Sequence, residues 1–183
     1  LLIEPTDLPA QLIAATRWLH ASGVSLAISS SATDTVFAAF EIAREAGAAI
    51  SFDTNLRLRL CPADRAGAIT NAAAAKADVV KTSLEDALVL TGEQDPRRIA
   101  AIYLARGARS VAVTLGGDGC FAATAERSLQ LPGHQVAAVD ATGAGDAFMG
   151  ALLAELCGGR DIFSAARFAN AAAALSTVGY GAV

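Results

Sequence analysis

The sequence has little of several residue types, and each shortage excludes a class of protein. Only 17 % of its 183 residues are charged and the formal net charge is −4, which excludes a general attraction to nucleic acid or to an anionic membrane. Three widely spaced cysteines exclude a disulfide framework and a cysteine metal site, so we expect reduced thiols in a cytoplasmic protein. No apolar run reaches membrane-spanning length, and no basic-then-apolar segment opens the chain.

What the chain does have is an apolar content of 54 %, enough to fill a sizeable core. Short apolar runs alternate with helical patterns along its whole length. The expected strands are 18–20, 24–29, 48–52, 78–81, 110–115 and 120–124, and the expected helices are 34–46, 63–77, 84–90, 96–107, 144–157 and 161–175. Ser31 and Asp34 resemble a capping box, and Gly47 a C-terminal cap, for the helix 34–46. The alternation predicts one α/β domain over 1–183, with a mostly parallel sheet and helices on both faces.

Polar and glycine-rich segments follow four of the expected strands and the further apolar run "HQVAAV" (134–139). Ligands of such sheets bind outside the carboxyl ends of the strands, so we expect these segments to share one crevice. The alternative is that they are ordinary polar loops. The five segments are Ser29–Ser31, 53–59, 81–83, 116–119 and 140–146, the last after "HQVAAV".

The segment "VDATGAGDAFMG" (139–150) is the most informative of these. Glycines allow a ligand to approach the backbone closely, and the amides at the start of a helix form a positive cradle. Such a cradle at Gly143, Ala144 and Gly145 suits a phosphoryl group in transfer, and Asp146 beside it can take a proton from an attacking hydroxyl. Spacing alone leaves open an ordinary glycine turn with an acidic residue in the first helical turn.

The motif "DATGAGDAF" resembles the C-terminal signature of the ribokinase-like (PfkB-type) carbohydrate kinases. The segments "RWLHASGVSLAIS", "ISFDTNLRLRL", "LGGDG" and "RFANAAAALSTVGYGAV" are most similar to 2-keto-3-deoxygluconate kinases. The resemblance implies a ribokinase-like three-layer α/β/α (Rossmann-like) fold. It also implies that this chain is a fragment, with the N-terminal part, the β-lid and a short C-terminal piece missing.

The resemblance implies a transfer of the γ-phosphoryl group of ATP to a sugar acid, 2-keto-3-deoxygluconate. Asp146 would be the general base and would touch the substrate, with Gly143, Ala144 and Gly145 as the anion hole. Asn55 and Arg57 would lie between the sugar and the ATP phosphates, and the guanidinium of Arg57 suits a carboxylate as well as a phosphate. A solvated surface position is the alternative for Arg57.

The remaining implied roles concern the nucleotide and its ions. Residues assigned to ATP are Ser83, Thr114, Gly116, Gly117, Gly119 and Asn170, together with Asn55, Arg57, Gly143 and Gly145. Asn170 would lie near the adenine, or else pack locally. Asp86 and Asp140 are candidates for Mg²⁺, with Asp86 as an exposed helix residue the alternative. A monovalent cation such as K⁺ is a further expectation, as is a homo-oligomer formed through the missing lid.

Other functions stay open from the sequence. A neutral-sugar kinase of the ribokinase or fructokinase type is one, and a non-catalytic nucleotide-binding fragment is another. A dinucleotide-binding oxidoreductase is disfavoured, because no Gly-x-Gly-x-x-Gly segment opens the first strand–helix turn.

Overall fold

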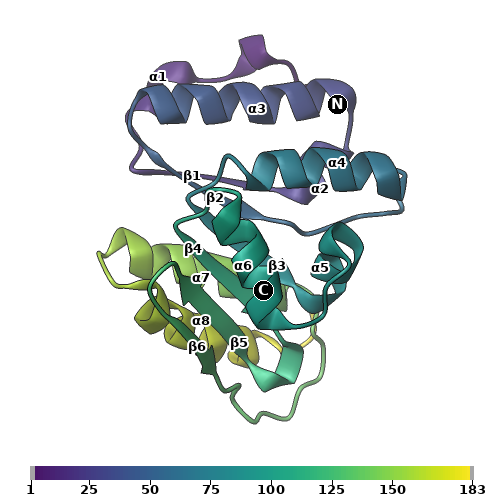
Figure 1. The fold of residues 1–183 in the computed structure, drawn as a ribbon, viewed down its shortest axis with the longest axis vertical. Coiled ribbons are helices and arrows are strands. Elements are labelled where there is room, and N and C mark those ends of the chain that lie inside the picture. The colour runs from purple at the N-terminus through teal and green to yellow at the C-terminus, as the bar shows by residue number, and fades with distance from the viewer. Residues whose placement is uncertain (1–2, 182–183) are drawn as a thin grey trace.

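The computed structural model of this protein describes residues 3–181, and within them six strands form one sheet in the order β1-β2-β3-β4-β5-β6 (Figure 1). The strands are β1 Trp18–Ser22, β2 Ala49–Asp53, β3 Val79–Ser83, β4 Ser110–Thr114, β5 Cys120–Thr124 and β6 Ser128–Leu131. Strands β1 to β4 are parallel, and β5 and β6 extend the sheet in antiparallel fashion. The last two residues of the segment 167–183, which contributes to the resemblance, lie outside the described residues.

Helices lie on both faces of this sheet, which confirms the predicted α/β class (Figure 1). The helices are α1 Ala10–Ala14, α2 Gly23–Ala27, α3 Ser30–Glu45, α4 Ala63–Ala74, α5 Leu84–Thr91, α6 Pro96–Ala105, α7 Ala144–Cys157 and α8 Ile162–Ser176, with short 3₁₀ turns at Pro5–Asp7 and Gly116–Asp118. Helices α3 to α6 pack on one face together with α1 and α2, and α7 and α8 pair on the other.

The strict alternation of side chains along each strand builds two separate cores. On the α3–α6 face, Phe40 of α3 meets Phe52 of β2 edge-on, with ring centroids 6.4 Å apart. On the α7–α8 face, Val79 and Ala112 of the central strands pack near Phe148 of α7. The parallel strands are covered on both sides, and besides apolar residues they carry several Ser and Thr residues. A charged residue at such a covered position needs a partner, and the Asp and Lys residues of β1 to β4 are Asp53 and Lys81.

Two predictions about the first strand–helix unit are wrong. Residues 24–29 are not a strand, because the chain turns from β1 directly into α2. Gly23 makes that turn possible, since a Cβ there would lie 1.9 Å from the carbonyl oxygen of Thr54. The capping box is also wrong: α3 begins earlier, and its N-cap is Ser29, whose hydroxyl accepts the N–H of Ala32. A short apolar run fits strand and helix equally well, and only packing separates them.

The C-terminal half also differs in detail from the expectations. The segment 134–139 ("HQVAAV") is not part of a strand, and β6 was not predicted. Gly47 follows the last helical residues of α3 with φ 77°, as a residue after a helix end often does. The predicted hairpin between 110–115 and 120–124 is confirmed as the antiparallel pair β4–β5.

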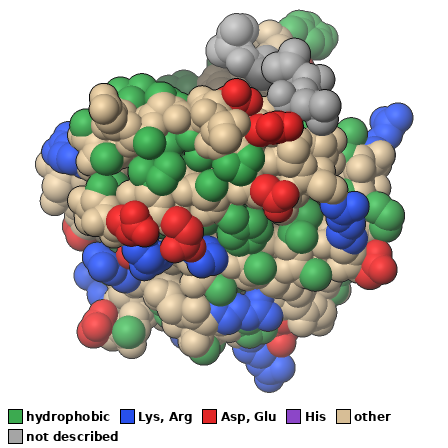
Figure 2. All heavy atoms as spheres, turned by 90° about the horizontal axis from the view of Figure 1, so that it is seen from above, with side chains coloured by type: hydrophobic (Ala, Val, Ile, Leu, Met, Phe, Trp, Pro, Cys, Tyr) green, Lys and Arg blue, Asp and Glu red, His purple; other side chains and the backbone are tan. Residues whose placement is uncertain are grey.

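The face in Figure 2 shows acidic and basic side chains interspersed with apolar ones rather than a patch of one sign. Among residues 3–181, no helix combines the length and the apolar character that crossing a membrane requires.

Candidate functional site

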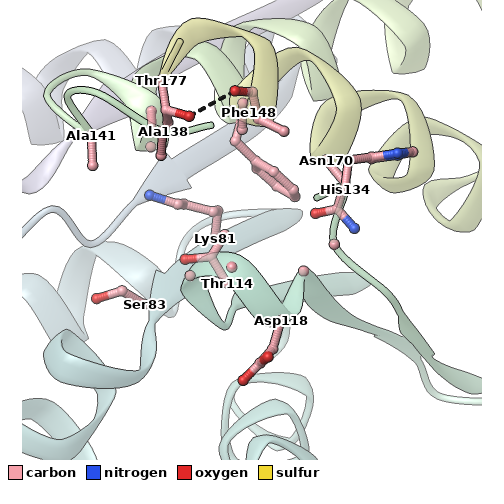
Figure 3. Close-up of a pocket in the computed structure, with 18 of the residues that line it drawn as sticks. Lys81, Ser83, Thr114, Asp118, His134, Ala138, Ala141, Phe148, Asn170 and Thr177 are labelled. Atoms are coloured by element: carbon pink, nitrogen blue, oxygen red, sulfur yellow. Dashed lines mark hydrogen bonds between the residues drawn. The ribbon is translucent and has the colours of Figure 1, made fainter. Parts of the chain in front are cut away.

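A cavity of about 600 Å³ lies at the carboxyl ends of β2, β3 and β4 (Figure 3). Predicted site residues that line it are Asn55, Arg57, Ser83, Asp86, Thr114, Gly116, Gly117, Gly119, Ala144, Gly145 and Asn170. Gly143, Asp140 and Asp146 are not among its lining residues. Four of the five polar segments thus meet in one place, as the crevice hypothesis predicts. The fifth, Ser29–Ser31, does not line the cavity and forms the start of α3.

The turn after β2 is held by the carboxylate of Asp86. Its Oδ2 accepts the hydroxyl of Thr54 at 2.7 Å and the N–H of Leu56 at 3.2 Å. Ser83 caps the same helix by accepting the N–H of Asp86. Asp86 is therefore not a plain exposed helix residue, because it ties the first turn of α5 to the turn that presents Asn55 and Arg57.

Asn55 itself has φ 31°, an unusual value for a residue with a side chain. Such backbone strain is found where surrounding bonds fix a turn that a site needs. Arg57, two residues on, is exposed and reaches the cavity, with one guanidinium N–H donated to the carbonyl of Leu56.

The floor beneath these turns holds a buried ion pair that the sequence reasoning did not assign. Lys81 and Asp53 are cross-strand partners in β3 and β2, and their Nζ and Oδ2 atoms are 3.0 Å apart. Both residues are almost fully buried, at 5 % and 2 % exposure. Burial raises the pKa of the Asp53 carboxyl, and the Lys81 charge opposes that rise. In Figure 3 the ammonium of Lys81 ends on the side of the cavity where Ala138 and Ala141 lie.

The start of α7 has the form of an anion-binding turn, with one correction. Gly143, the N-cap, has φ 79°. The N–H of Ala144 was predicted to be free, but it donates to the carbonyl of Ala141 and closes a turn. Among the described residues, the amides of Gly145 and Asp146 meet no acceptor. Within residues 3–181 the amide of Gly143 has no acceptor either, so the correction concerns Ala144 alone, and Asp146 adds a donor that was not predicted.

Asp140 organises the loop in front of α7. Its Oδ1 accepts the hydroxyl and the N–H of Thr142, and its Oδ2 accepts the N–H of Gly181. These bonds, the Thr142 hydroxyl first, hold the pKa of Asp140 below its ordinary value. Both carboxylate oxygens of Asp140 thus already have protein partners.

Asp146 lies in the first turn of α7 with an exposed side chain, outside the core. Burial lowers the pKa of His20 on β1; the hydrogen bond with Ser51 and the negative charge of Asp146 oppose this fall, and the Lys81 charge adds to it. The charges of Asp146 and Lys81 therefore act on the same imidazole, on the α7 side of the sheet.

The glycine turn after β4 serves two purposes. A Cβ on Gly119, where φ is 94°, would lie 2.2 Å from the carbonyl oxygen of Leu131, and one on Gly133 would lie 2.1 Å from that of Gly117. Two backbones thus pack directly against each other here. A Cβ on Gly117 would meet nothing within 4 Å. The same holds for Gly116, so the first half of the turn has room for a ligand close to its backbone.

Asn170 of α8 is buried, and its side-chain N–H groups donate to the carbonyls of Leu131 and Pro132 at 3.3 Å. It lines the cavity while fixing the segment that follows β6. Asn170 therefore makes the local contacts that one of the two alternatives expected, and its position near an adenine stays a prediction.

Sequence reasoning gave no individual role to several cavity residues. Lys81 and Asp118 lie within the predicted crevice segments 81–83 and 116–119, whereas Glu85, His134, Phe148 and Thr177 lie outside all of them. Only Lys81 had a recognisable signal, because a charged residue stands in the otherwise uncharged strand "VVKTS". His134 follows β6 in a segment without regular structure, whose approach to the cavity depends on the tertiary fold. Within residues 3–181, no three His, Cys, Asp or Glu residues are grouped so that they could hold a metal ion.

Known proteins with similar sequences and structures supply an independent observation. The family model described as pfkB family carbohydrate kinase matches residues 2–183. A fructokinase of Vibrio alginolyticus is 39 % identical over 177 residues, which are 91 % of this chain and 56 % of that protein. The chain thus spans little more than half the length of this curated relative.

Two solved structures have nearly the same fold. The fructokinase of Vibrio cholerae O395 with fructose, ADP and calcium ion has a TM-score of 0.87 and 34 % identity, over 99 % of this chain and 60 % of its own. An E. coli chain in complex with ATP and Mg²⁺ has a TM-score of 0.89 and 28 % identity, over 98 % and 58 %. This likeness confirms the ribokinase-like α/β fold. The two Vibrio proteins are named fructokinase and the E. coli chain Ribokinase II, and none of the three is named 2-keto-3-deoxygluconate kinase, so the predicted subfamily is not supported.

Proposed function

We propose, from the premise that this chain belongs to the pfkB family of carbohydrate kinases, that the complete protein transfers the γ-phosphoryl group of ATP to a hydroxyl of a neutral sugar, fructose being the first candidate. The observation that carries the proposal is the convergence of three features on one cavity. These are the open glycine turn at Gly117, the guanidinium of Arg57 and the start of α7 at Gly145. Together they offer donors and positive charge to a chain of phosphates.

The start of α7 would stabilise the group in transfer. The amides of Gly145 and Asp146 have no protein acceptor, and the helix dipole adds positive potential at the same point. The equatorial oxygens of a phosphoryl group in flight carry negative charge, which such donors favour. The exposed carboxylate of Asp146, in the same helical turn, would accept the proton of the attacking sugar hydroxyl.

ATP would lie along the turn 116–119, where the space at Gly117 admits its phosphates. Mg²⁺ commonly needs only one or two carboxylates besides phosphates and waters. Asp86, which lines the cavity, fits such a contact, whereas Asp140 has both oxygens engaged in its loop. When bound there, Mg²⁺ would neutralise part of the phosphate charge. A need for K⁺ stays a prediction that activity measured with and without KCl would test.

The substrate is the less determined part of the proposal. The name fructokinase among the relatives supports a neutral ketose. The exposed guanidinium of Arg57 in the cavity is the observation that keeps a sugar acid, 2-keto-3-deoxygluconate, as the second candidate. Assembly through a lid and a cytoplasmic location stay predictions, which sedimentation and cell fractionation would test.

The test compares ATP-dependent phosphorylation of fructose, ribose and 2-keto-3-deoxygluconate by the complete protein. We expect the highest kcat/KM with fructose. Replacement of Asp146 by Asn should lower kcat roughly 10²–10⁴-fold and leave the melting temperature nearly unchanged, because the side chain is exposed. A matched control is Asp34→Asn, an exposed aspartate on α3. ATP binding without phosphorylation of any sugar would favour the non-catalytic alternative.

A further inference from the structure

The Lys81–Asp53 pair is an unusual choice for the middle of a sheet. On the same sheet face Lys81 is flanked by Val79 and Ala112, whereas Asp53 is flanked by Ser51 and Ser22, so the pair lies between an apolar and a polar part of this face. Buried ion pairs seldom stabilise a fold more than apolar residues of the same volume, because both charges lose their hydration. The Lys81–Asp53 pair lies at the cavity, which Lys81 lines, so we expect a role of this pair other than stabilising the fold.

On one side, Lys81 is tied to the turn after β2. Its ammonium is bonded to Oδ2 of Asp53, and Oδ1 of the same carboxylate accepts the N–H of Asn55. The backbone carbonyl of Lys81 accepts the N–H of Thr54 at 3.0 Å. The strained turn at Asn55 is thus connected to Lys81 twice, through the ammonium by way of Asp53 and through the backbone carbonyl by way of Thr54.

On the other side, Lys81 reaches the start of α7. A Cβ on Gly145 would lie 3.0 Å from Nζ, closer than ordinary van der Waals contact. The ammonium therefore occupies the space that a side chain at position 145 would need. Gly145 also carries one of the amides without a protein acceptor.

We propose that Lys81 is a positioning residue that sets the distance between the turn bearing Asn55 and the anion-binding start of α7. This inference rests on the proposed kinase function. Asp53 neutralises the lysine, so its ammonium acts as a spacer rather than as a free phosphate ligand. Misplacement of reacting groups by about 1 Å can cost roughly 100-fold in rate, so a loose spacer should be visible in kcat.

The test is a double replacement in the complete protein. Lys81→Met alone leaves Asp53 buried without a partner and should lower the melting temperature by roughly 10 °C. Lys81→Met with Asp53→Asn removes both charges and should restore most of that loss. If Lys81 is a spacer, kcat of the double variant stays about 100-fold low while KM for ATP changes less than about threefold. The exposed pair Lys76 and Glu41, replaced as K76M/E41Q, is the matched control and should alter neither quantity.

Two outcomes separate this inference from the function on which it rests. If the unmodified protein phosphorylates a sugar and the double variant regains full kcat with its stability, Lys81 only neutralises Asp53 and the inference fails. If the unmodified protein phosphorylates no sugar, the kinase proposal fails. In that case the inference is tested by binding: the affinity for adenylyl imidodiphosphate is divided by the affinity for ADP, in the unmodified protein and in the double variant. The terminal phosphate, which ADP lacks, is the group that must reach the start of α7. A ratio equal in the double variant and the unmodified protein would overturn the spacer role.

Discussion

Replacing Asp86 with Ala separates a structural role of this carboxylate from a role confined to magnesium. The change removes the acceptor of the Thr54 hydroxyl and of the Leu56 N–H. Hydrogen bonds to a charged group contribute roughly 1.5–3 kcal/mol each. Thr54 retains a second bond to the hydroxyl of Thr82 at 3.0 Å, which limits the loss. We therefore expect the free energy of unfolding to fall by about 3 kcal/mol.

The assay is urea unfolding in EDTA without nucleotide, so that no metal contributes. Asp86→Asn keeps one acceptor oxygen and should lose about 1 kcal/mol. Glu85→Ala, an exposed neighbour on the same helix, should stay within about 0.5 kcal/mol of the unmodified protein. A D86A variant as stable as the E85A control in EDTA would refute the reasoning. Asp86 would then matter only through bound metal, and its loss would appear only with Mg²⁺ and ATP.

Two further replacements test the turns around the site. Gly23→Ala places a Cβ 1.9 Å from the carbonyl oxygen of Thr54 and should lower the free energy of unfolding in urea by about 3 kcal/mol. The control is Gly67→Ala in α4, where the Cβ meets nothing within 4 Å, and this change should be neutral or stabilising. Equal effects of the two replacements would contradict the close approach at Gly23. The lowered pKa of Asp140 means that its stabilisation is complete above the ordinary pKa of 3.8 and is lost as pH falls through the folded value. Asp140→Asn should therefore flatten the fall of melting temperature at acid pH, and an unchanged acid limb would exclude this carboxylate as its cause.

Features coded by neighbouring residues were predictable from the sequence. The alternation of strands and helices places β2, β3 and β4 within a residue or two of the expected runs. The helix expected over 84–90 ends at Thr91, with Gly92 at φ 73° as its C-cap. The glycine turn between β4 and β5 and the start of α7 at residue 144 are local in the same sense. Each depends on backbone propensity and periodicity over a few residues. The roles assigned to individual site residues stay predictions for the experiments above.

The chemistry of the cavity wall depends on residues that meet only after folding. Asp86 accepts a hydrogen bond from Thr54, which lies 32 residues away in the sequence, and Lys81 pairs with Asp53, which lies 28 residues away. Whether the N–H of Ala144 is free was settled by the turn it closes with Ala141. The local sequence pattern, by itself, determined the fold class and the glycine turn that lines the cavity. Packing between distant segments decided which charges are paired and which amides stay open, because burial and partner distance are properties of the tertiary structure alone.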